Sequence, residues 1–255
     1  MRSTQNSDMH ALKFAMGTLM AQQQKLFGDI AELRNAELSV FSQWGDDEII
    51  QYLIGQLVLR EERFIEFGVA DYTESNTRFL LLHDNWSGLV MDCSPDNIES
   101  IKRDDIYWRY DLTAISAFLT VENVNQAIAS AGFSGEVGLL HIDVDGNDYW
   151  LWNAINTVSP IIAVIKYNSL FGLERSITTP YDSTFSRFSA HFSGLYAGAS
   201  LPALCDLAHE KGYSFIGSNS AGNNAYFVRK DRLGILKELS VEHCYVASKF
   251  REHRD

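Results

Sequence analysis

Short apolar runs alternate with amphipathic segments along the central part of this chain, which is the pattern of an open α/β sheet. Strands are expected at five of these runs, namely 63–69, 86–93, 106–112, 137–144 and 160–168. Helices are expected at 41–58 after an opening turn, at 75–85 beginning at Ser75 or Asn76, from 94 onward, at 121–132 and at 147–155. Because each gap between strands has room for a helix, successive strands are expected to lie parallel.

The C-terminal part of the chain has a different pattern. Residues 201–212 have the period of a helix that ends at Gly212, and two apolar runs follow at 213–220 and 223–230. Too few residues separate these runs for a helical crossover, so they are expected to pair antiparallel. The expected fold is α/β, with a mostly parallel seven-stranded sheet, helices on both faces and a C-terminal antiparallel hairpin.

Residues 169–200 form a long connection that is rich in Ser, Thr and aromatic side chains and lacks a clear period. Connections of this length inside a compact domain usually have a function. We therefore expect a lid or a substrate-binding loop here.

The N-terminal segment, residues 1–40, is set apart by a coiled-coil spacing. Its seam positions alternate steps of four and three and are Leu12, Met16, Leu19, Gln23, Leu26, Ile30 and Leu33. A lone polar seam residue such as Gln23 can set the register of a coiled coil. The segment is either a homo-oligomer contact or a single amphipathic helix that packs on its own domain.

An acidic residue stands at or near the end of each of the first four apolar runs. These residues are Glu66, Asp92, Asp111 and the pair Asp143 and Asp145. Open parallel sheets bind ligands in the crevice outside the carboxyl ends of their strands. Carboxylates in that crevice suit a divalent metal or a ligand rich in hydroxyl and amino groups. The pattern therefore indicates a nucleotide-like ligand.

Composition narrows the choice of partner and location. The 255 residues are 46% hydrophobic and carry a formal net charge of −12. Phosphate binding needs clustered Lys and Arg, so a nucleic-acid partner is not expected. No apolar run approaches the roughly 20 residues that span a bilayer. The N-terminus has no cleavable export signal, and the three widely spaced Cys residues include no CxxC pair, so a cytoplasmic location is expected.

The segments that follow the predicted strands carry a more specific signal. They read EFGVADYTESNT, MDCSPDN, YDLTA and HIDVDGNDYWLW, with FSQWGDDEII upstream and YNSLFGLERSITTPYD downstream. With these motifs the chain resembles an S-adenosylmethionine-dependent methyltransferase of the FkbM-like type over about residues 41–230. The resemblance implies the Rossmann-like class I methyltransferase fold, with a catalytic domain at 41–255 and an acceptor-binding role for the insertion at 169–200.

The resemblance also implies S-adenosylmethionine as the cofactor. Its expected contacts are Glu66, Gly68, Thr73, Asn76, Asp92, Cys93, Asp111, Leu112 and Asp143. Gly68, which has no Cβ, would let the backbone approach the methionine part. Asp92 would accept both ribose hydroxyls and Asp111 the adenine amino group. The alternative for these acids is a helix cap or a surface turn.

The DVDGND segment places Asp143, Asp145 and Asp148 within six residues. Their mutual repulsion is costly unless a cation or hydrogen bonds compensate it. Related O-methyltransferases hold a divalent metal here, and the resemblance admits Mg²⁺ on Asp143, Asp145 and Asn168. The structural alternative is that Asp143 binds loop amides and Asp148 caps the next helix.

Lys166 departs from the family pattern, because relatives commonly have Glu before this Tyr-Asn pair. A lysine is not a metal ligand at neutral pH. Three interpretations are open. The Lys166 ammonium pairs with Asp143 or Asp145 in place of a cation, or it acts as a general base through a pKa depressed by burial, or it disables the site.

The expected catalytic residues are His141, Asp143, Lys166 and His191. His141 is expected on the same strand face as Asp143, because side chains alternate along a strand. Sugars bind through aromatic faces and carboxylates, so the expected acceptor contacts are Tyr167, Asn168, Tyr181, Asp182 and Tyr196. The turn that contains Asn219, Asn223 and Asn224 either closes the pocket or only joins the hairpin.

These expectations converge on methyl transfer to a hydroxyl of a saccharide or of a glycosylated small metabolite. One alternative is an enzyme that cleaves or cyclises the same cofactor without an acceptor, which the Lys166 replacement would fit. Another is a non-catalytic interaction subunit that keeps the fold and assembles through its N-terminal helix.

Overall fold

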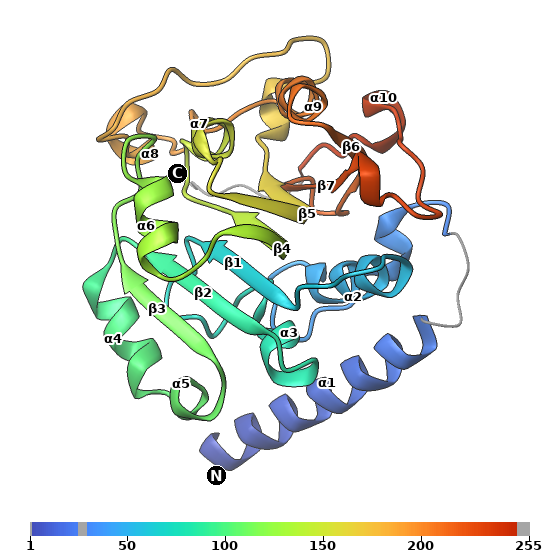
Figure 1. The fold of residues 1–255 in the computed structure, drawn as a ribbon, viewed down its shortest axis with the longest axis vertical. Coiled ribbons are helices and arrows are strands. Elements are labelled where there is room, and N and C mark those ends of the chain that lie inside the picture. Colours follow the sequence, from blue (N-terminus) through green and yellow to red (C-terminus); the bar gives the residue numbers. More distant parts are fainter. Residues whose placement is uncertain (1, 25–29, 249–255) are drawn as a thin grey trace.

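A seven-stranded sheet forms the centre of the computed structural model, which describes residues 2–24 and 30–248 (Figure 1). The strands are β1 (Arg63–Phe67), β2 (Ser87–Asp92), β3 (Leu112–Ser116), β4 (Gly135–Ile142), β5 (Val158–Lys166), β6 (Tyr213–Ser218) and β7 (Asn224–Arg229). Their order is β3-β2-β1-β4-β5-β7-β6, and β7 runs antiparallel to both of its neighbours while the other pairs are parallel. The predicted fold class, α/β with a mostly parallel seven-stranded sheet, helices on both faces and a C-terminal antiparallel hairpin, is confirmed.

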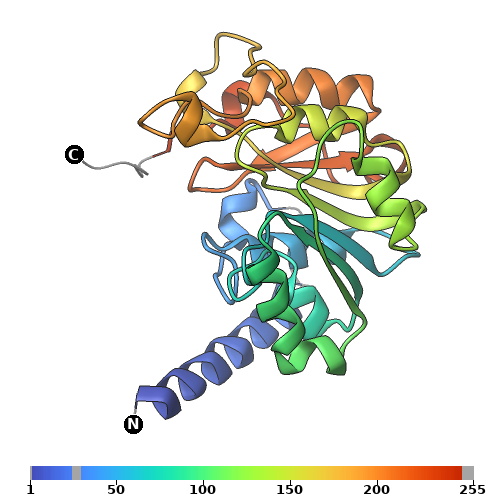
Figure 2. The same cartoon turned by 90° about the vertical axis from the view of Figure 1, so that its left-hand side faces the viewer.

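Helices cover both faces of the sheet (Figure 2). They are α1 (Arg2–Gln24), η1 (Leu33–Ala36), α2 (Asp46–Gln56), α3 (Arg78–His83), α4 (Pro95–Arg103), α5 (Asp105–Arg109), α6 (Val124–Ser130), α7 (Asp148–Ala154), η2 (Ser169–Phe171), α8 (Arg187–Ala190), α9 (Leu201–Glu210), η3 (Lys230–Arg232) and α10 (Val241–Cys244). Helices α2 to α5 share one apolar core with the sheet, and α6, α7 and α9 share the other. None of the described helices combines the length and the apolar character that crossing a bilayer requires.

The two cores follow from the alternation of side chains along the strands. In β1, Ile65 and Phe67 lie in one core and Phe64 lies in the other. The predicted helix at 41–58 is confirmed as α2, where Ile49, Ile50 and Leu53 are fully buried. Local patterns thus place most of the elements correctly.

The third strand is an exception, because the prediction of a strand at 106–112 is wrong. Asp104 caps a helix there by accepting a hydrogen bond from the backbone N–H of Ile106 (3.1 Å), and α5 follows. Asp105 and Arg109 form an (i, i+4) ion pair of 2.9 Å on this helix. These helix signals outweigh the strand preference of the Tyr107–Trp108 pair. The strand β3 begins only at residue 112, so Asp111 precedes it instead of following it.

The N-terminal helix α1 packs on its own domain through a face other than the predicted seam. Phe14 and Ala21 lie in a small apolar cluster with Phe79. The seam residues Leu12, Met16 and Leu19 are 56%, 49% and 66% exposed. The seam itself does not continue as one helix, since α1 ends at Gln24, Leu26 lies outside the described residues and Leu33 is buried in η1.

The insertion at 169–200 is mostly irregular and is fastened to the domain near both of its ends. Trp150 Nε1 donates to the carbonyl of Thr179 (2.9 Å), and Asn168 Nδ2 donates to the carbonyls of Leu195 (2.8 Å) and Ala197 (2.9 Å). An isolated bridge pairs residues 178 and 199. The part between these anchors, which includes α8, lies beside the carboxyl ends of the strands.

Candidate functional site

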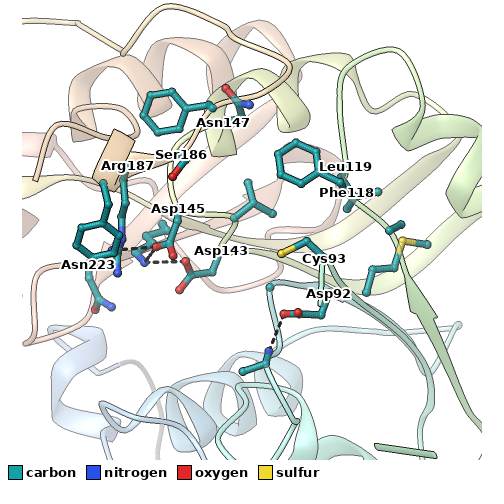
Figure 3. Close-up of a pocket in the computed structure, with 18 of the residues that line it drawn as sticks. Asp92, Cys93, Phe118, Leu119, Asp143, Asp145, Asn147, Ser186, Arg187 and Asn223 are labelled. Carbon is teal, nitrogen blue, oxygen red and sulfur yellow. Dashed lines mark hydrogen bonds and ion pairs between the residues drawn. The ribbon is translucent and has the colours of Figure 1, made fainter. Parts of the chain in front are cut away.

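A cavity of about 850 Å³ runs along the carboxyl ends of the strands (Figure 3). Of the residues predicted from the sequence, those that line it are Gly68, Asp92, Cys93, Asp143, Asp145, Lys166 and Asn223. Figure 3 shows Asp92 and Cys93 on one side and Asp145, Arg187 and Asn223 on the other. The acidic residues that end β2 and follow β4 therefore meet in one place, as the sheet geometry predicted.

Gly68 holds the loop after β1 against the loop after β4. Its φ is 77°, and a Cβ built on it would lie 1.6 Å from the carbonyl oxygen of Asp143. No other residue fits there without moving that backbone. The close approach predicted at Gly68 is real, but the group that approaches is the Asp143 carbonyl of the protein itself.

Asp92 is held at the end of β2 by three hydrogen bonds. Its Oδ2 accepts from the backbone N–H of Ala70 (2.9 Å), and its Oδ1 accepts from the N–H of Ser94 (2.9 Å) and from Asn97 Nδ2 (2.9 Å). Ala70 adopts a left-handed conformation (φ 48°) that turns its N–H toward the carboxylate. The carboxylate is fixed at the cavity wall and keeps lone pairs for further donors.

Glu66 and His141 form a buried pair behind the cavity wall. His141 Nδ1 lies 2.9 Å from Glu66 Oε1, and its Nε2 lies 3.2 Å from Asn76 Nδ2. The carboxylate of Glu66 also accepts hydrogen bonds from the hydroxyls of Ser75 and Thr77. Burial alone would raise the pKa of Glu66, but these hydrogen bonds lower it. Burial would likewise lower the pKa of His141, but the Glu66 carboxylate raises it.

This pair changes three of the predicted roles. Glu66, Asn76 and His141 are 2%, 7% and 4% exposed, and none of them is among the described residues that line the cavity. His141 is therefore not placed to act as a general base, and Glu66 and Asn76 are not placed to contact a ligand directly. They join β1, β4 and the loop before α3, so they position the cavity wall.

Lys166 lies between two carboxylates at the other side of the cavity. Its Nζ is 2.7 Å from Asp143 Oδ1 and 2.9 Å from Asp145 Oδ1. Arg187 of the insertion adds a second cation, 3.0 Å from Asp145 Oδ1. Burial alone would lower the pKa of Lys166, but these carboxylates and Asp148 raise it. Burial would raise the pKa of Asp145, but Lys166 and Arg187 lower it.

These contacts decide between the interpretations of Lys166. The ion pairs predicted for its ammonium are confirmed, with both Asp143 and Asp145. The alternative of a general base requires a depressed pKa, whereas the neighbouring carboxylates shift the pKa of Lys166 upward. The third interpretation, that Lys166 disables the site, stays a prediction.

The same residues do not fit a Mg²⁺ ion. The ammonium takes the place that a cation would need between the two carboxylates, and the described residues contain no group of three acidic, His or Cys side chains arranged to hold a metal. Asn168 Oδ1 accepts from the N–H of Leu170 instead (3.0 Å). Asp148 accepts from the N–H groups of Val144 and Gly146 (both 2.9 Å). It therefore binds amides of the preceding loop, the role that the structural alternative gave to Asp143, and it does not cap α7, whose N-cap residue is Asn147.

Asp111 and Leu112 lie at the wrong edge of the sheet for a ligand contact. Leu112 pairs with Gly88 at the amino end of β2, whereas Ser116 pairs with Asp92 at the carboxyl end. Asp111 accepts a hydrogen bond from Ser87 Oγ (2.7 Å) on the surface. The adenine contact predicted for Asp111 is thereby corrected. The error in that prediction follows from the shifted third strand. The residues that do reach the cavity after β3 are Ala117, Phe118 and Leu119.

The predicted acceptor residues of the insertion lie outside the cavity. Tyr181 accepts a hydrogen bond from the N–H of Val121 and lies 2.6 Å from Glu122 Oε2. Asp182 binds its own loop at Thr184, and His191 binds Ser193. Of the described residues that line the cavity, none is Tyr181, Asp182, His191, Tyr196 or Thr73. His191 therefore lies away from this cavity, and its catalytic role stays a prediction.

Tyr167 and Asn168 line a second cavity of about 60 Å³, which shares Lys166 and Arg187 with the first. Tyr167 donates to the carbonyl of Val246 (3.0 Å), and burial raises its pKa to about 12. The two predicted acceptor residues thus line this second cavity and not the first.

Several lining residues carried no signal in the sequence. They are Gln43, Trp44, Phe118, Leu119, Arg187 and Phe188. Phe118 and Leu119 were hidden by the shifted strand, and Arg187 and Phe188 stand in a segment without a period. Gln43 and Trp44 belong to the FSQWGDDEII motif, which resembled the family without indicating a contact.

Comparison with known proteins gives structural neighbours only. No protein-family model matches the chain, and no curated protein matches its sequence. An O-methyltransferase family protein from Burkholderia thailandensis is 16% identical, with a TM-score of 0.42 over 67% of this chain and 51% of that one. The O-methyltransferase from Bacillus cereus, solved in complex with SAH, is 14% identical, with a TM-score of 0.47 over 83% and 89%. The CurJ carbon methyltransferase is 12% identical, with a TM-score of 0.48 over 78% and 57%.

These neighbours are methyltransferases that act on oxygen or on carbon. At such identities the likeness concerns the fold alone. The chain also spans only about half the length of the Burkholderia protein. What this chain does must therefore be argued from its own cavity.

Proposed function

We propose that this chain is an S-adenosylmethionine-dependent O-methyltransferase of the FkbM-like group, acting on a hydroxyl of a saccharide or a glycosylated small metabolite. The observation that supports it best is the Asp92 carboxylate. It is fixed by Ala70, Ser94 and Asn97 at the end of β2, on the wall of a cavity of about 850 Å³. A fixed carboxylate with spare lone pairs suits the two adjacent hydroxyls of a ribose.

The residues around Asp92 fit the rest of the cofactor. Phe118 and Leu119 offer an apolar place for adenine beside the ribose site. Gly68 and Ala70 border the next part of the cavity, where the methionine part would lie. We call this part, lined by Gly68, Ala70, Asp92, Cys93, Phe118 and Leu119, the nucleoside end. S-adenosylmethionine supplies an already activated methyl group when bound, so the protein has mainly to align the acceptor hydroxyl.

We assign to Asp143 the role of accepting the proton of the acceptor hydroxyl. It lines the cavity between the nucleoside end and Lys166, and one of its oxygens is held by the Lys166 ammonium at 2.7 Å. The ion pair fixes the orientation of the carboxylate toward the cavity. A carboxylate oriented in this way can accept the proton that leaves the acceptor hydroxyl. Lys166 acts through Asp143 and is a positioning residue.

The insertion at 169–200 completes the site as a lid. Residues 185–188 line the cavity opposite the strand ends, and Arg187 ties this part to Asp145. We assign residues 41–255 to the methyltransferase domain and residues 1–40 to an N-terminal element, of which Leu33 and Ala36 pack into the core of that domain.

The test is methyl transfer from isotopically labelled S-adenosylmethionine to a panel of glycosides, detected by mass spectrometry. We expect transfer to a hydroxyl by the unmodified chain, and a loss of at least 100-fold in kcat for Asp143→Asn with cofactor affinity retained. Cofactor cleavage without transfer would support the lyase alternative. Absence of cofactor binding would support the interaction subunit.

A further inference from the structure

The cavity extends well beyond the residues assigned to the cofactor. Its lining begins after β3 and ends at Asn223, directly before β7. These strands are five steps apart in the sheet, and steps of ~4.8 Å give roughly 24 Å. The nucleoside end takes the ends of β3, β2 and β1, and Asp143 follows β4. We call the remaining part the acceptor end; it is lined by Gln43, Trp44, Asp145, Lys166, Arg187 and Asn223.

Two adjacent buried aspartates of α2 build one wall of the acceptor end. The first to consider is Asp47, whose Oδ2 accepts from the three successive backbone N–H groups of residues 40–42 (2.8, 3.0 and 2.7 Å) and from Ser42 Oγ (2.7 Å). Such a carboxylate fixes the loop between residues 40 and 45. The side chains that this loop presents to the cavity are Gln43 and Trp44.

Asp46 fixes the other part of this wall, the turn between β6 and β7. Its Oδ1 accepts from Asn219 Nδ2 (3.1 Å), from Asn224 Nδ2 (2.9 Å) and from the hydroxyl of Tyr226. Asn219 Nδ2 also donates to Asn223 Oδ1 (2.8 Å). The backbone N–H of Asn223 donates to Asn219 Oδ1 (3.2 Å), whereas its side-chain nitrogen Nδ2 has no hydrogen-bond partner among the described residues, and Asn223 lines the cavity. The wall therefore offers two amides and an indole ring, all uncharged.

The charged groups of the acceptor end neutralise one another. Among the described residues that line the cavity, the cations are Lys166 and Arg187, and both are paired with Asp145 or Asp143. The N–H groups before α7, which could have bound a phosphate, are already bound by Asp148. A phosphate needs free cations or free N–H groups, and here it would face carboxylates instead.

We propose that the acceptor end takes an uncharged, hydroxyl-rich ring and excludes phosphorylated and nucleotide-linked sugars, with Gln43, Trp44 and Asn223 as its contact residues. That this region takes the methyl acceptor rests on the proposed function. That it excludes phosphate groups rests on the observed ion pairs. It also places the reaction in a sequence. The nucleotide carrier of the sugar must already have been released, by glycosyl transfer or by hydrolysis, before the methyl group is added.

The exclusion is tested by calorimetric titration of inorganic pyrophosphate into the full chain loaded with S-adenosylhomocysteine. We expect no saturable binding by the unmodified chain. Asp145→Asn removes the carboxylate between Lys166 and Arg187, so this variant is expected to bind pyrophosphate saturably. Asp143→Asn, which removes one of the two carboxylates paired with Lys166, gives the same gain if the first variant fails to fold. Asp182→Asn, an exposed acid of the insertion with the same charge change, is the control.

Saturation of the unmodified chain by pyrophosphate would overturn the inference, as would an equal gain in Asp182→Asn or no gain in either of the other variants. The contact residues are tested with a panel of neutral methyl glycosides and their phosphates. We expect transfer to neutral members only, and a rise in KM of at least tenfold for Asn223→Ala while the affinity for S-adenosylhomocysteine is retained. Transfer to a phosphate would contradict the proposal.

The proposed function fails separately from this inference. If S-adenosylhomocysteine does not bind, the cofactor assignment is wrong, while pyrophosphate titration of the unloaded chain still tests the charge argument. If it binds and no glycoside is methylated, the saccharide class is wrong and the cofactor assignment stands.

Discussion

The two ends of the cavity are built in opposite ways. At the nucleoside end, Asp92 is held by groups close to it in the chain or on the neighbouring strand, and its partners are neutral N–H donors. At the acceptor end, Lys166, Asp145 and Arg187 come from three separate segments, and each charge is satisfied by another. At the nucleoside end the charge of the Asp92 carboxylate is therefore available to a ligand, whereas the charges at the acceptor end are already paired with one another.

This difference indicates what each end can discriminate. A carboxylate that retains lone pairs binds hydroxyl donors strongly, because hydrogen bonds to charged groups are stronger than those between neutral groups. Ion pairs that satisfy one another leave neutral amides and aromatic rings as the contacts. We infer that affinity is concentrated at the nucleoside end and that selection of the acceptor occurs at the other.

The largest effect is expected at the nucleoside end. Asp92→Ala removes the two charge-assisted hydrogen bonds that we propose to the ribose, each worth about 1.5–3 kcal/mol, so the affinity for S-adenosylhomocysteine should fall at least ~100-fold. Asp111→Ala is the matched control, because Asp111 lies at the opposite edge of the sheet. Calorimetry measures both. Near-normal affinity in Asp92→Ala, or a loss in Asp111→Ala, would contradict the placement of the ribose.

The second effect is expected at the acceptor end. Lys166→Glu puts a third carboxylate beside Asp143 and Asp145, and their repulsion should lower the melting temperature by several degrees. Millimolar Mg²⁺ should restore it, because three carboxylates make a set that this hard ion prefers. Lys102→Glu, an exposed position with the same change in charge, should show neither effect. A parent chain stabilised by Mg²⁺ to the same extent would mean that Lys166 does not replace the cation.

A smaller effect concerns the wall built by α2. Glu48 follows Asp46 and Asp47, is fully buried, and its two oxygens have no partner among the described residues. Burial and the Asp47 and Asp84 carboxylates raise its pKa from 4.5 to about 8. The group therefore stabilises the fold fully below pH 4.5, and that contribution is lost as the pH rises through 8.

Glu48→Gln, which cannot ionise, should accordingly be more stable than the parent at pH 8–9, by of the order of 2–3 kcal/mol. Chemical unfolding across the pH range measures this difference. Glu99→Gln, an exposed glutamate paired with Arg103, is the control. Parallel pH profiles for the parent and Glu48→Gln would show that Glu48 is not the group that titrates.

The smallest effect on the cavity is expected from α1. Its exposed residues Leu12, Met16 and Leu19 face away from the domain, and we propose that they contact a second copy of the chain. Replacing the three by Gln should lower the solution mass to that of a monomer and leave cofactor affinity unchanged. Val58→Gln, which alters an exposed apolar residue elsewhere, is the control. Deletion of residues 1–35 is less informative, because it also removes the buried Leu33.

The nucleoside end was predicted in part, at Gly68, Asp92 and Cys93, and the reasons lie in local sequence. An acid that directly follows a buried strand is placed at the carboxyl edge by the strand itself, which is why Asp92 and Asp143 were found. Asp111 was wrongly placed at the carboxyl end of the third strand. The expected strand is a helix, because Asp104 caps it and Asp105 pairs with Arg109.

The acceptor end was only partly predictable. The pairing of Lys166 with Asp143 and Asp145 followed from charge at adjacent strand ends, where strand order alone brings the groups together. Arg187 reaches Asp145 from an insertion without a period, and Asn223 is oriented by a network that begins at Asp46, far away in the chain. Contacts of this kind depend on tertiary packing and leave no local pattern.

The most direct test of this account is an experimental structure of the chain with S-adenosylhomocysteine bound. We predict the ribose on Asp92, the adenine beside Phe118 and Leu119, and the sulfur near Asp143, with Lys166 still paired to both carboxylates. A ligand bound with its nucleoside at the acceptor end, or adenine held by Asp111, would contradict the central claim.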